Sequence, residues 1–88
     1  MVTKTIKVTN SQGFHMRPAT VFVNEMAKFS SDVKIIFNGT EVNGKSLMNL
    51  IAACIKFGAE IELRCDGDDE EAALAKAVEL ISSGLGEE

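Results

Sequence analysis

His15 is the only histidine of the chain, and it lies where a helix is about to begin. Pro18 suits the first turn of a helix, because its missing N–H would have no intrahelical partner there and its φ is already helical. His15 is therefore expected at or just before the N-cap, where free backbone N–H groups and the positive end of the helix dipole converge. Arg17 adds a guanidinium beside them. Together they predict an anion site, and a neutral imidazole facing it has the lone pair that a phosphoryl acceptor needs.

The alternative for His15 is a structural one, because a single histidine in a small domain is more often a surface or capping residue. Its neighbours favour the reactive role. Residues 13–20, Gly-Phe-His-Met-Arg-Pro-Ala-Thr, resemble the active-site segment of the HPr family, the histidine-containing phosphocarriers of the bacterial sugar phosphotransferase system. Residues 43–48 resemble the regulatory serine segment of that family, and residues 38–39 and 58–61 fall where its turn and last strand would. The resemblance spans essentially the whole chain.

The resemblance implies a phosphocarrier that is a substrate of other enzymes and not itself an enzyme. His15 would accept a phosphoryl group from enzyme I and pass it to the enzyme IIA domain of a sugar-specific enzyme II, with Arg17 stabilising the phosphate. No cofactor and no metal ion are implied at the site, since Mg²⁺ belongs to the donor enzyme. Gln12 and Met16 depart from the residues common in the family, so Gln12 receives no firm role and the details of docking near Met16 stay open.

Ser46 has two interpretations. As an N-cap it would accept a hydrogen bond from a backbone N–H of the next helix, which is the commoner role for such a serine. As a phosphorylation site, the same helix terminus would stabilise a phosphate that adds a charge of about −1.5 to −2. The resemblance implies regulatory phosphorylation here, with an HPr kinase/phosphorylase and a catabolite-control repressor as further partners. The sequence shows the capability and not its use in the host.

The segment 47–57 is apolar nearly all round and predicts a short helix. One set of its side chains is expected to pack on the sheet: Leu50, Ala53, Cys54 and Phe57. A second set clusters on another side of the helix: Leu47, Met48 and Ile51. The second set is either deeper core or, as the resemblance implies, joins Met16 and Thr20 in a surface that docks on partner proteins.

The remaining elements follow from local patterns. Residues 2–8, 33–37, 40–43 and 59–65 predict strands, with turns at 10–13 and, of type I′, at Asn38-Gly39. The first helix should bury one apolar stripe: Ala19, Phe22, Val23, Met26 and Ala27. The last helix should begin at a capping box of Asp68 and Glu71, bury Leu74, Ala77, Val78 and Ile81, and stop at Gly84.

The order β-α-β-β-α-β-α predicts an α+β fold, an open-faced two-layer sandwich with three helices on one face of a sheet. Several ferredoxin-like modules would fit the pattern equally well. The resemblance implies the four-stranded antiparallel sheet specifically. With 88 residues, of which 45% are hydrophobic and 25% charged, the chain is expected to form a single domain over 1–88 and to be a monomer.

Charge and composition restrict the classes of partner. The net charge is −4, but residues 1–58 carry seven Lys or Arg against three Asp or Glu, and residues 59–88 carry two against ten. The basic residues Arg17 and Lys45 lie beside the candidate sites, where they could steer acidic protein partners. No basic cluster with interleaved aromatics is present, and a pI near 4.9 opposes binding to a phosphate backbone, so direct binding of nucleic acid is not expected.

The chain is expected to be cytoplasmic. No uninterrupted apolar run approaches the roughly 18 residues that a membrane span needs, and residues 1–9 alternate in polarity instead of forming a signal peptide. Membrane insertion is therefore not expected. Cys54 and Cys65 form no CxxC motif and are predicted to be reduced, buried, small hydrophobes.

Two other classes of function compete with the phosphocarrier. The first is a regulatory interaction protein that acts mainly as a corepressor when Ser46 is phosphorylated. The second is an α+β binding module without phosphotransfer. The presence of His15 disfavours the first, and the resemblance disfavours the second.

Overall fold

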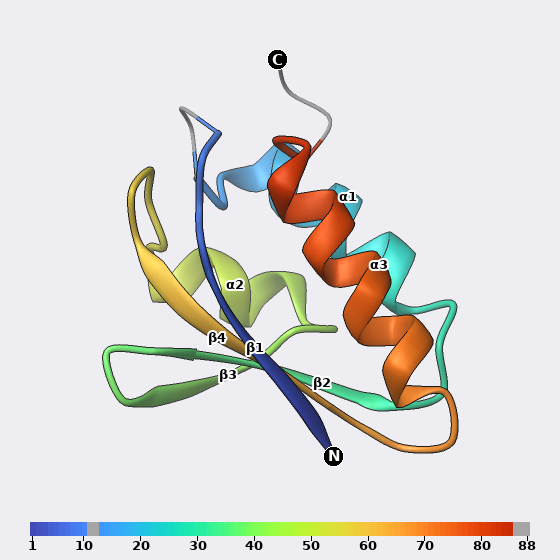
Figure 1. Cartoon of the computed structure of the whole chain (residues 1–88). Helices are drawn as coiled ribbons and strands as arrows, with labels where there is room; N and C mark the ends of the chain where they lie inside the picture. The colour runs from blue at the N-terminus through green and yellow to red at the C-terminus, as the bar shows by residue number, and fades with distance from the viewer. Residues whose placement is uncertain (11–12, 86–88) are drawn as a thin grey trace.

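The computed structural model describes residues 1–10 and 13–85, so Gln12 lies outside the described residues. The elements are β1 (Val2–Lys7), α1 (Met16–Met26), β2 (Asp32–Phe37), β3 (Thr40–Asn43), α2 (Leu47–Ala53), β4 (Glu60–Asp66) and α3 (Glu70–Ser82). The predicted order is confirmed, with the helices together on one side of the sheet (Figure 1). No helix in the described ranges is long and apolar enough to span a membrane.

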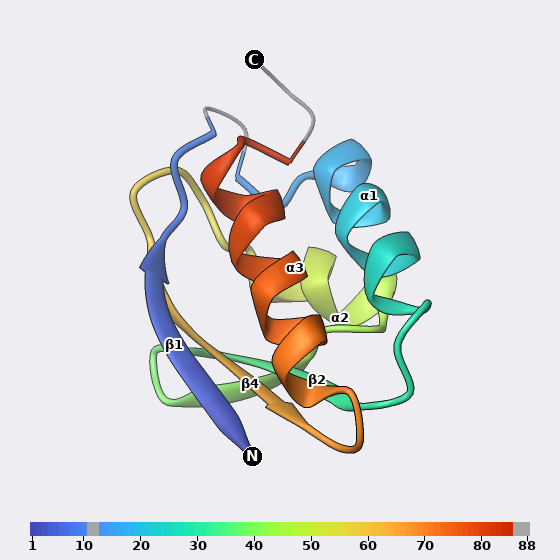
Figure 2. The same cartoon turned by 45° about the vertical axis from the view of Figure 1, so that its right-hand side comes forward.

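The four strands form one antiparallel sheet in the order β1-β4-β2-β3. The β2–β3 hairpin turns at Asn38 and Gly39, whose φ values of +53° and +79° are the left-handed pair that a type I′ turn requires. In β4, Ile61, Leu63 and Cys65 are buried while the residues between them face outward, as the alternation predicted. Figure 2 shows α3 lying across β1 and β4, with α1 and α2 beside it.

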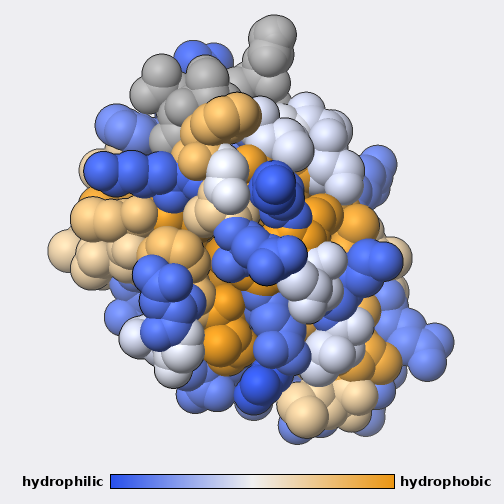
Figure 3. Space-filling model, turned by 60° about the vertical axis from the view of Figure 1, so that its left-hand side comes forward, coloured by the Kyte–Doolittle hydropathy of each residue, from blue (hydrophilic) through white to orange (hydrophobic). Residues whose placement is uncertain are grey.

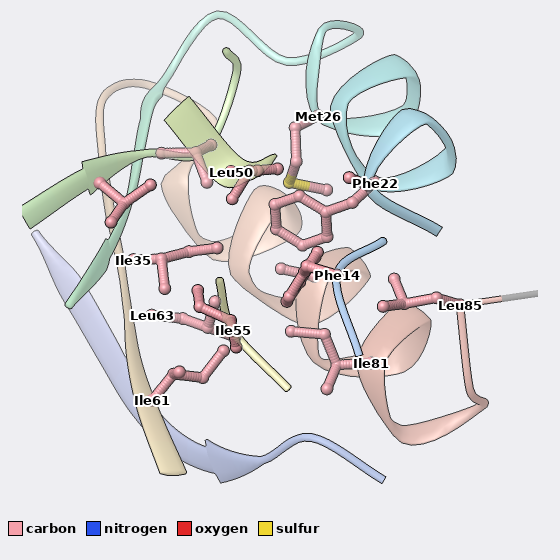
Figure 4. Packing of buried hydrophobic residues seen from close by; sticks show 14 of the residues in the cluster. Phe14, Phe22, Met26, Ile35, Leu50, Ile55, Ile61, Leu63, Ile81 and Leu85 are labelled. Carbon is pink, nitrogen blue, oxygen red and sulfur yellow. The ribbon is translucent and has the colours of Figure 1, made fainter. Parts of the chain in front are cut away.

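The core fills the space between the sheet and the helices (Figure 4). Phe22 and Met26 enter it from α1, and the ring of Phe22 meets that of Phe14 edge-on, with centroids 5.4 Å apart. Ala27, predicted to join this stripe, is exposed because it is the C-cap residue of α1, where the helix has already ended. Phe14, the residue directly before His15, thus belongs to the core.

Helix α2 ends four residues earlier than predicted. It stops at Ala53, because Cys54 adopts a left-handed conformation with φ +56° and ψ +44° and its N–H donates to the Ile51 carbonyl. Beyond this point the chain turns and Ile55 becomes buried. The prediction that Cys54 and Phe57 pack on the sheet is therefore wrong: Cys54 is exposed, and Phe57 is 65% exposed. Cys65 is buried as predicted, and burial raises the pKa of its thiol.

Helix α3 begins one residue later than the predicted capping box. Its N-cap residue is Asp69, not Asp68, and the carboxylate does not cap the helix. The carboxylate accepts the backbone N–H groups of Ser30 and Ser31, each at 2.9 Å, and the Ser31 hydroxyl. These bonds tie the start of α3 to the loop before β2. They also lower the pKa of Asp69 to about 2, with the Ser31 hydroxyl as the largest cause. Gly84, with φ +85°, follows α3 as the predicted stop.

Asp69→Asn is expected to make the free energy of unfolding less dependent on pH in the acid range. Because folding lowers the pKa of Asp69 from 3.8 to about 2, its contribution is fully present above about pH 5 and is lost as the pH falls through 2. Urea unfolding at several pH values should therefore show the variant less stable at pH 7, with the gap closing toward pH 2. Asp68→Asn, at an exposed position outside this contact, is the control. A gap that is constant with pH would contradict the assignment.

Candidate functional site

His15 is the N-cap residue of α1, as predicted. Its backbone is extended, with φ −70° and ψ 178°, and its carbonyl accepts the N–H of Ala19 at 2.9 Å as the first bond of the helix. The imidazole is exposed and does not cap the helix. His15 therefore starts the helix through its main chain and leaves its ring available for chemistry.

The first turn of α1 carries the residues from which the sequence predicts an anion site. Met16 and Arg17 are exposed there, Pro18 is buried, and the turn contains no acidic residue that would compete for its N–H groups. The Thr20 hydroxyl donates to the Met16 carbonyl at 2.7 Å, so it is engaged within the helix. Arg17 lies in the first turn of α1, two residues after His15, and its role toward a phosphate stays a prediction, as does the docking role of Thr20.

The loop that carries His15 is fixed against the segment after α2. The Phe14 N–H donates to the Ile55 carbonyl at 2.8 Å. Gly13 has φ +62°, and a Cβ there would lie 2.5 Å from the Ile55 oxygen and 2.6 Å from the Lys56 Cα. Only glycine fits this close approach. As a result, residues far apart in the sequence form a common surface with His15.

A groove of about 520 Å³ lies at this junction. It is lined by Phe14, His15, Met16, Ile51, Cys54, Ile55, Lys56 and Phe57. The sequence pointed to His15, Met16 and Ile51 as site residues and did not point to the other five. No local signal marks Cys54 as a helix stop, so the residues after it were expected in the helix or its buried face. Among the described residues, no three His, Cys, Asp or Glu side chains are grouped as a metal site would require.

The outer side of α2 continues the apolar surface of the groove. Met48 is 78% exposed, whereas Leu47 and Ile51 are half-buried. Leu47 and Met48 do not line the groove, but they lie four and three residues before Ile51 and so share its side of the helix. We call the following set the docking patch, because the sequence predicts a docking role for all of its members except Phe57, which the structure adds: Met16, Leu47, Met48, Ile51 and Phe57. Figure 3, which turns the left-hand side of Figure 1 forward, shows hydrophobic residues intermixed with hydrophilic ones on that face.

Ser46 is the N-cap of α2, and its hydroxyl oxygen accepts the N–H of Asn49 at 3.3 Å. The capping interpretation is confirmed. Lys45, expected to add positive charge to the surface, has its ammonium group bonded to the Phe29 carbonyl at 2.6 Å. The charge of Lys45 is therefore held at the loop after α1.

Cys54→Gly is expected to stabilise the protein. Cys54 holds a left-handed conformation that costs a non-glycine residue on the order of 1 kcal/mol, and its exposed side chain has little packing to lose. We expect the free energy of unfolding to rise by about 0.5–1 kcal/mol, measured by urea denaturation. Cys54→Ala is the control, because it removes the thiol and keeps the strain. Equal stability of the glycine and alanine variants would contradict the prediction.

Comparison with known proteins defines the class of the chain. Residues 2–83 match the family described as "PTS HPr component phosphorylation site". The Phosphocarrier protein HPr of Treponema pallidum is 38% identical over 88 residues, which cover 100% of both chains. The crystal structure of HPr-C-His from Thermoanaerobacter tengcongensis superposes with a TM-score of 0.96 at 40% identity, covering 100% of this chain and 99% of that chain. The class is that of the phosphocarriers of the phosphotransferase system.

The chain belongs to the HPr family, which confirms the resemblance found in the sequence. The HPr-like protein Crh of Bacillus subtilis is also similar, with 40% identity over 76 residues that cover 86% of this chain and 89% of that protein. A structure of Crh describes it as a catabolite repression protein. A further structure of the Thermoanaerobacter tengcongensis protein is an HPr dimer, with a TM-score of 0.79 at 39% identity, covering 99% of this chain and 100% of that chain.

Proposed function

We propose that the chain accepts a phosphoryl group on His15 from enzyme I and passes it to sugar-specific enzyme IIA domains. The observation that carries this proposal is the exposed imidazole of His15 at the N-terminus of α1, beside the groove. An imidazole nitrogen attacks phosphorus, a P–N bond forms and the bond to the donor breaks. Arg17 and the N–H groups of the first turn stabilise the phosphate. In the second transfer the next nucleophile attacks the same phosphorus, its bond to phosphorus forms and the P–N bond to His15 breaks.

In this proposal the chain is a carrier and not a catalyst, acting in the cytoplasm as a monomer. The docking patch, with Thr20 beside it, gives enzyme I and the enzyme IIA domains a common surface next to His15. The exposed methionines Met16 and Met48 suit a surface that several partners share, because their side chains adapt in shape.

The test is incubation with phosphoenolpyruvate and enzyme I, followed by transfer to an enzyme IIA domain. We expect about one phosphate per chain, labile in acid and stable in base, as a phosphoramidate is. Base-labile or acid-stable phosphate, or none, would contradict the proposal. Loss of the label to an added enzyme IIA domain would support the second half of the relay.

Ser46 favours a second, regulatory function. It caps α2 directly beside the docking patch, and the similar protein Crh is described as a catabolite repression protein. A phosphate on Ser46 would be stabilised by the helix terminus, and it would add negative charge next to Leu47 and Met48. An HPr kinase/phosphorylase and a catabolite-control repressor are the partners in this function.

Ser46→Asp is expected to weaken association with enzyme I while preserving the fold. Aspartate is a good N-cap, so α2 should persist. Its charge would repel an acidic partner, and we expect the apparent KM for the carrier to rise on the order of 10-fold at low salt, with partial recovery at high salt. Steady-state kinetics at two salt concentrations measure this. The control is Ser46→Ala, which loses the cap without adding charge and should keep the KM of the parent. An unchanged KM for Ser46→Asp would contradict the regulatory role and leave Ser46 only as the N-cap of α2.

A further inference from the structure

We infer that Asn10 is a positioning residue for His15, an inference that rests on the proposed phosphotransfer. Asn10 lies after β1 and is only 5% exposed. Its side-chain Nδ2 donates to the Gly13 carbonyl at 2.8 Å, and its own carbonyl accepts the Gly13 N–H at 3.1 Å. Asn10 and Gly13 are therefore joined by two bonds in opposite directions, which fix the peptide group just before Phe14.

Asn10 follows two residues after Val8, where the pairing of the sheet ends. The Val8 N–H donates to the Ala59 carbonyl, and the Gly58 N–H donates to the Val8 carbonyl, both at 2.8 Å. These bonds extend the pairing of β1 with β4 beyond the last strand residues. The amide of Asn10 thus connects the segment that leaves the sheet to the loop that carries His15.

The connection continues through Phe14 to the reactive residue. The amide group between Gly13 and Phe14 offers its oxygen to Asn10 and its N–H to the Ile55 carbonyl, so both of its polar atoms are bonded. The Phe14 ring is buried against Phe22. His15 follows directly, with its own carbonyl fixed by Ala19. Of these contacts, the Asn10 side chain is the one that can be removed without changing the main chain or the core.

Loss of this amide should misplace the imidazole more than it weakens docking. Phosphoryl transfer needs the attacking nitrogen close to phosphorus and aligned with it, and a displacement of about 1 Å can lower a rate by up to 100-fold. The docking patch, in contrast, comes largely from α2 and the residues after it, whereas the Asn10 amide bonds the Gly13 carbonyl on the loop before His15. We therefore expect an effect on the rate within the complex rather than on association.

The experiment compares Asn10→Ala, Asn10→Asp and Asn10→Ser with the parent protein. Aspartate keeps the shape of asparagine without its N–H donor, and serine keeps a donor of shorter reach. At saturating carrier, the rate of phosphorylation by enzyme I should fall on the order of 10-fold for the alanine and aspartate variants and recover in part for serine. The KM for the carrier should change less than 2-fold. Hydrogen exchange of the Phe14 amide should accelerate in the same order of variants.

Ser31→Ala is the matched control, because it removes a buried hydrogen bond to Asp69 outside the groove and lowers stability without reaching His15. It should leave both the rate and the Phe14 exchange unchanged. Parent-like rates and Phe14 exchange in the Asn10 variants, with only a lower unfolding midpoint, would overturn the positioning role. If the parent protein accepts no phosphate at all, the proposed function fails, and the Phe14 exchange still decides whether Asn10 orders the loop.

Discussion

His15→Ala is expected to abolish phosphorylation by enzyme I and phosphoenolpyruvate while the chain stays folded. The sequence holds no other histidine that could replace it. The His15 side chain is exposed and does not cap α1, so we expect its loss to change the free energy of unfolding by no more than about 0.5 kcal/mol. Phosphate incorporation at long times and urea unfolding measure the two effects. The rate should fall below detection, a larger effect than that of any neighbouring substitution.

Arg17→Ala separates the acceptor from the groups that stabilise the phosphate. It keeps the nucleophile and removes one charge-assisted contact, which is worth about 1.5–3 kcal/mol, so transfer should be slower but present. Acid-labile phosphate on the His15→Ala variant would overturn the assignment of the acceptor. A parent-like rate in Arg17→Ala would show that the helix terminus alone is sufficient for the phosphate.

The parts of the site that could be predicted from the sequence are those set by local chemistry. Pro18 in the first turn places His15 at the start of α1, Ser46 caps α2, and Asn38-Gly39 forms the turn between β2 and β3. In each case the residue type has a strong preference for one backbone conformation or one hydrogen bond within a few residues. Such preferences do not depend on the rest of the fold.

The contacts that the sequence could not predict are non-local. Asp68 was expected to cap α3, but the N-cap residue is Asp69, and its carboxylate instead accepts the N–H groups of Ser30 and Ser31, nearly 40 residues earlier. The ammonium group of Lys45 likewise bonds the Phe29 carbonyl, 16 residues away. Polar side chains choose among several partners of similar strength, and only the tertiary arrangement decides which partner is within reach.

The groove could not be predicted for two reasons, the position where α2 ends and a contact between distant segments. The residues that line the groove depend on where α2 ends. The helix ends at Cys54, although a glycine usually occupies the left-handed position at such an end. Its shape depends on the contact between Gly13 and Ile55, which joins segments some 40 residues apart. Lys56 and Phe57 could therefore be recognised as neighbours of His15 only in the folded protein.

Met48→Asp is expected to weaken binding to enzyme I strongly without destabilising the fold. Met48 is 78% exposed, so little packing is lost, and an aspartate in the first turn of α2 interacts favourably with the helix dipole. At the docking patch, in contrast, the change removes an apolar contact and adds a charge that would be desolvated on binding. Truncation of a central anchor costs about 2 kcal/mol or more, so the Kd should rise about 30-fold or more.

Two controls separate the lost contact from the added charge and from the fold. Met48→Ala removes the contact alone and should lie between the parent and Met48→Asp. Ala75→Asp adds the same charge at an exposed position of α3, none of whose residues lines the groove, and should leave the Kd nearly unchanged. Calorimetric titration with enzyme I measures binding, and urea unfolding measures the fold. A loss of several kcal/mol in the free energy of unfolding of Met48→Asp, or a parent-like Kd, would show that Met48 is not a docking residue. The shared surface beside His15 would then be formed by the groove residues after α2.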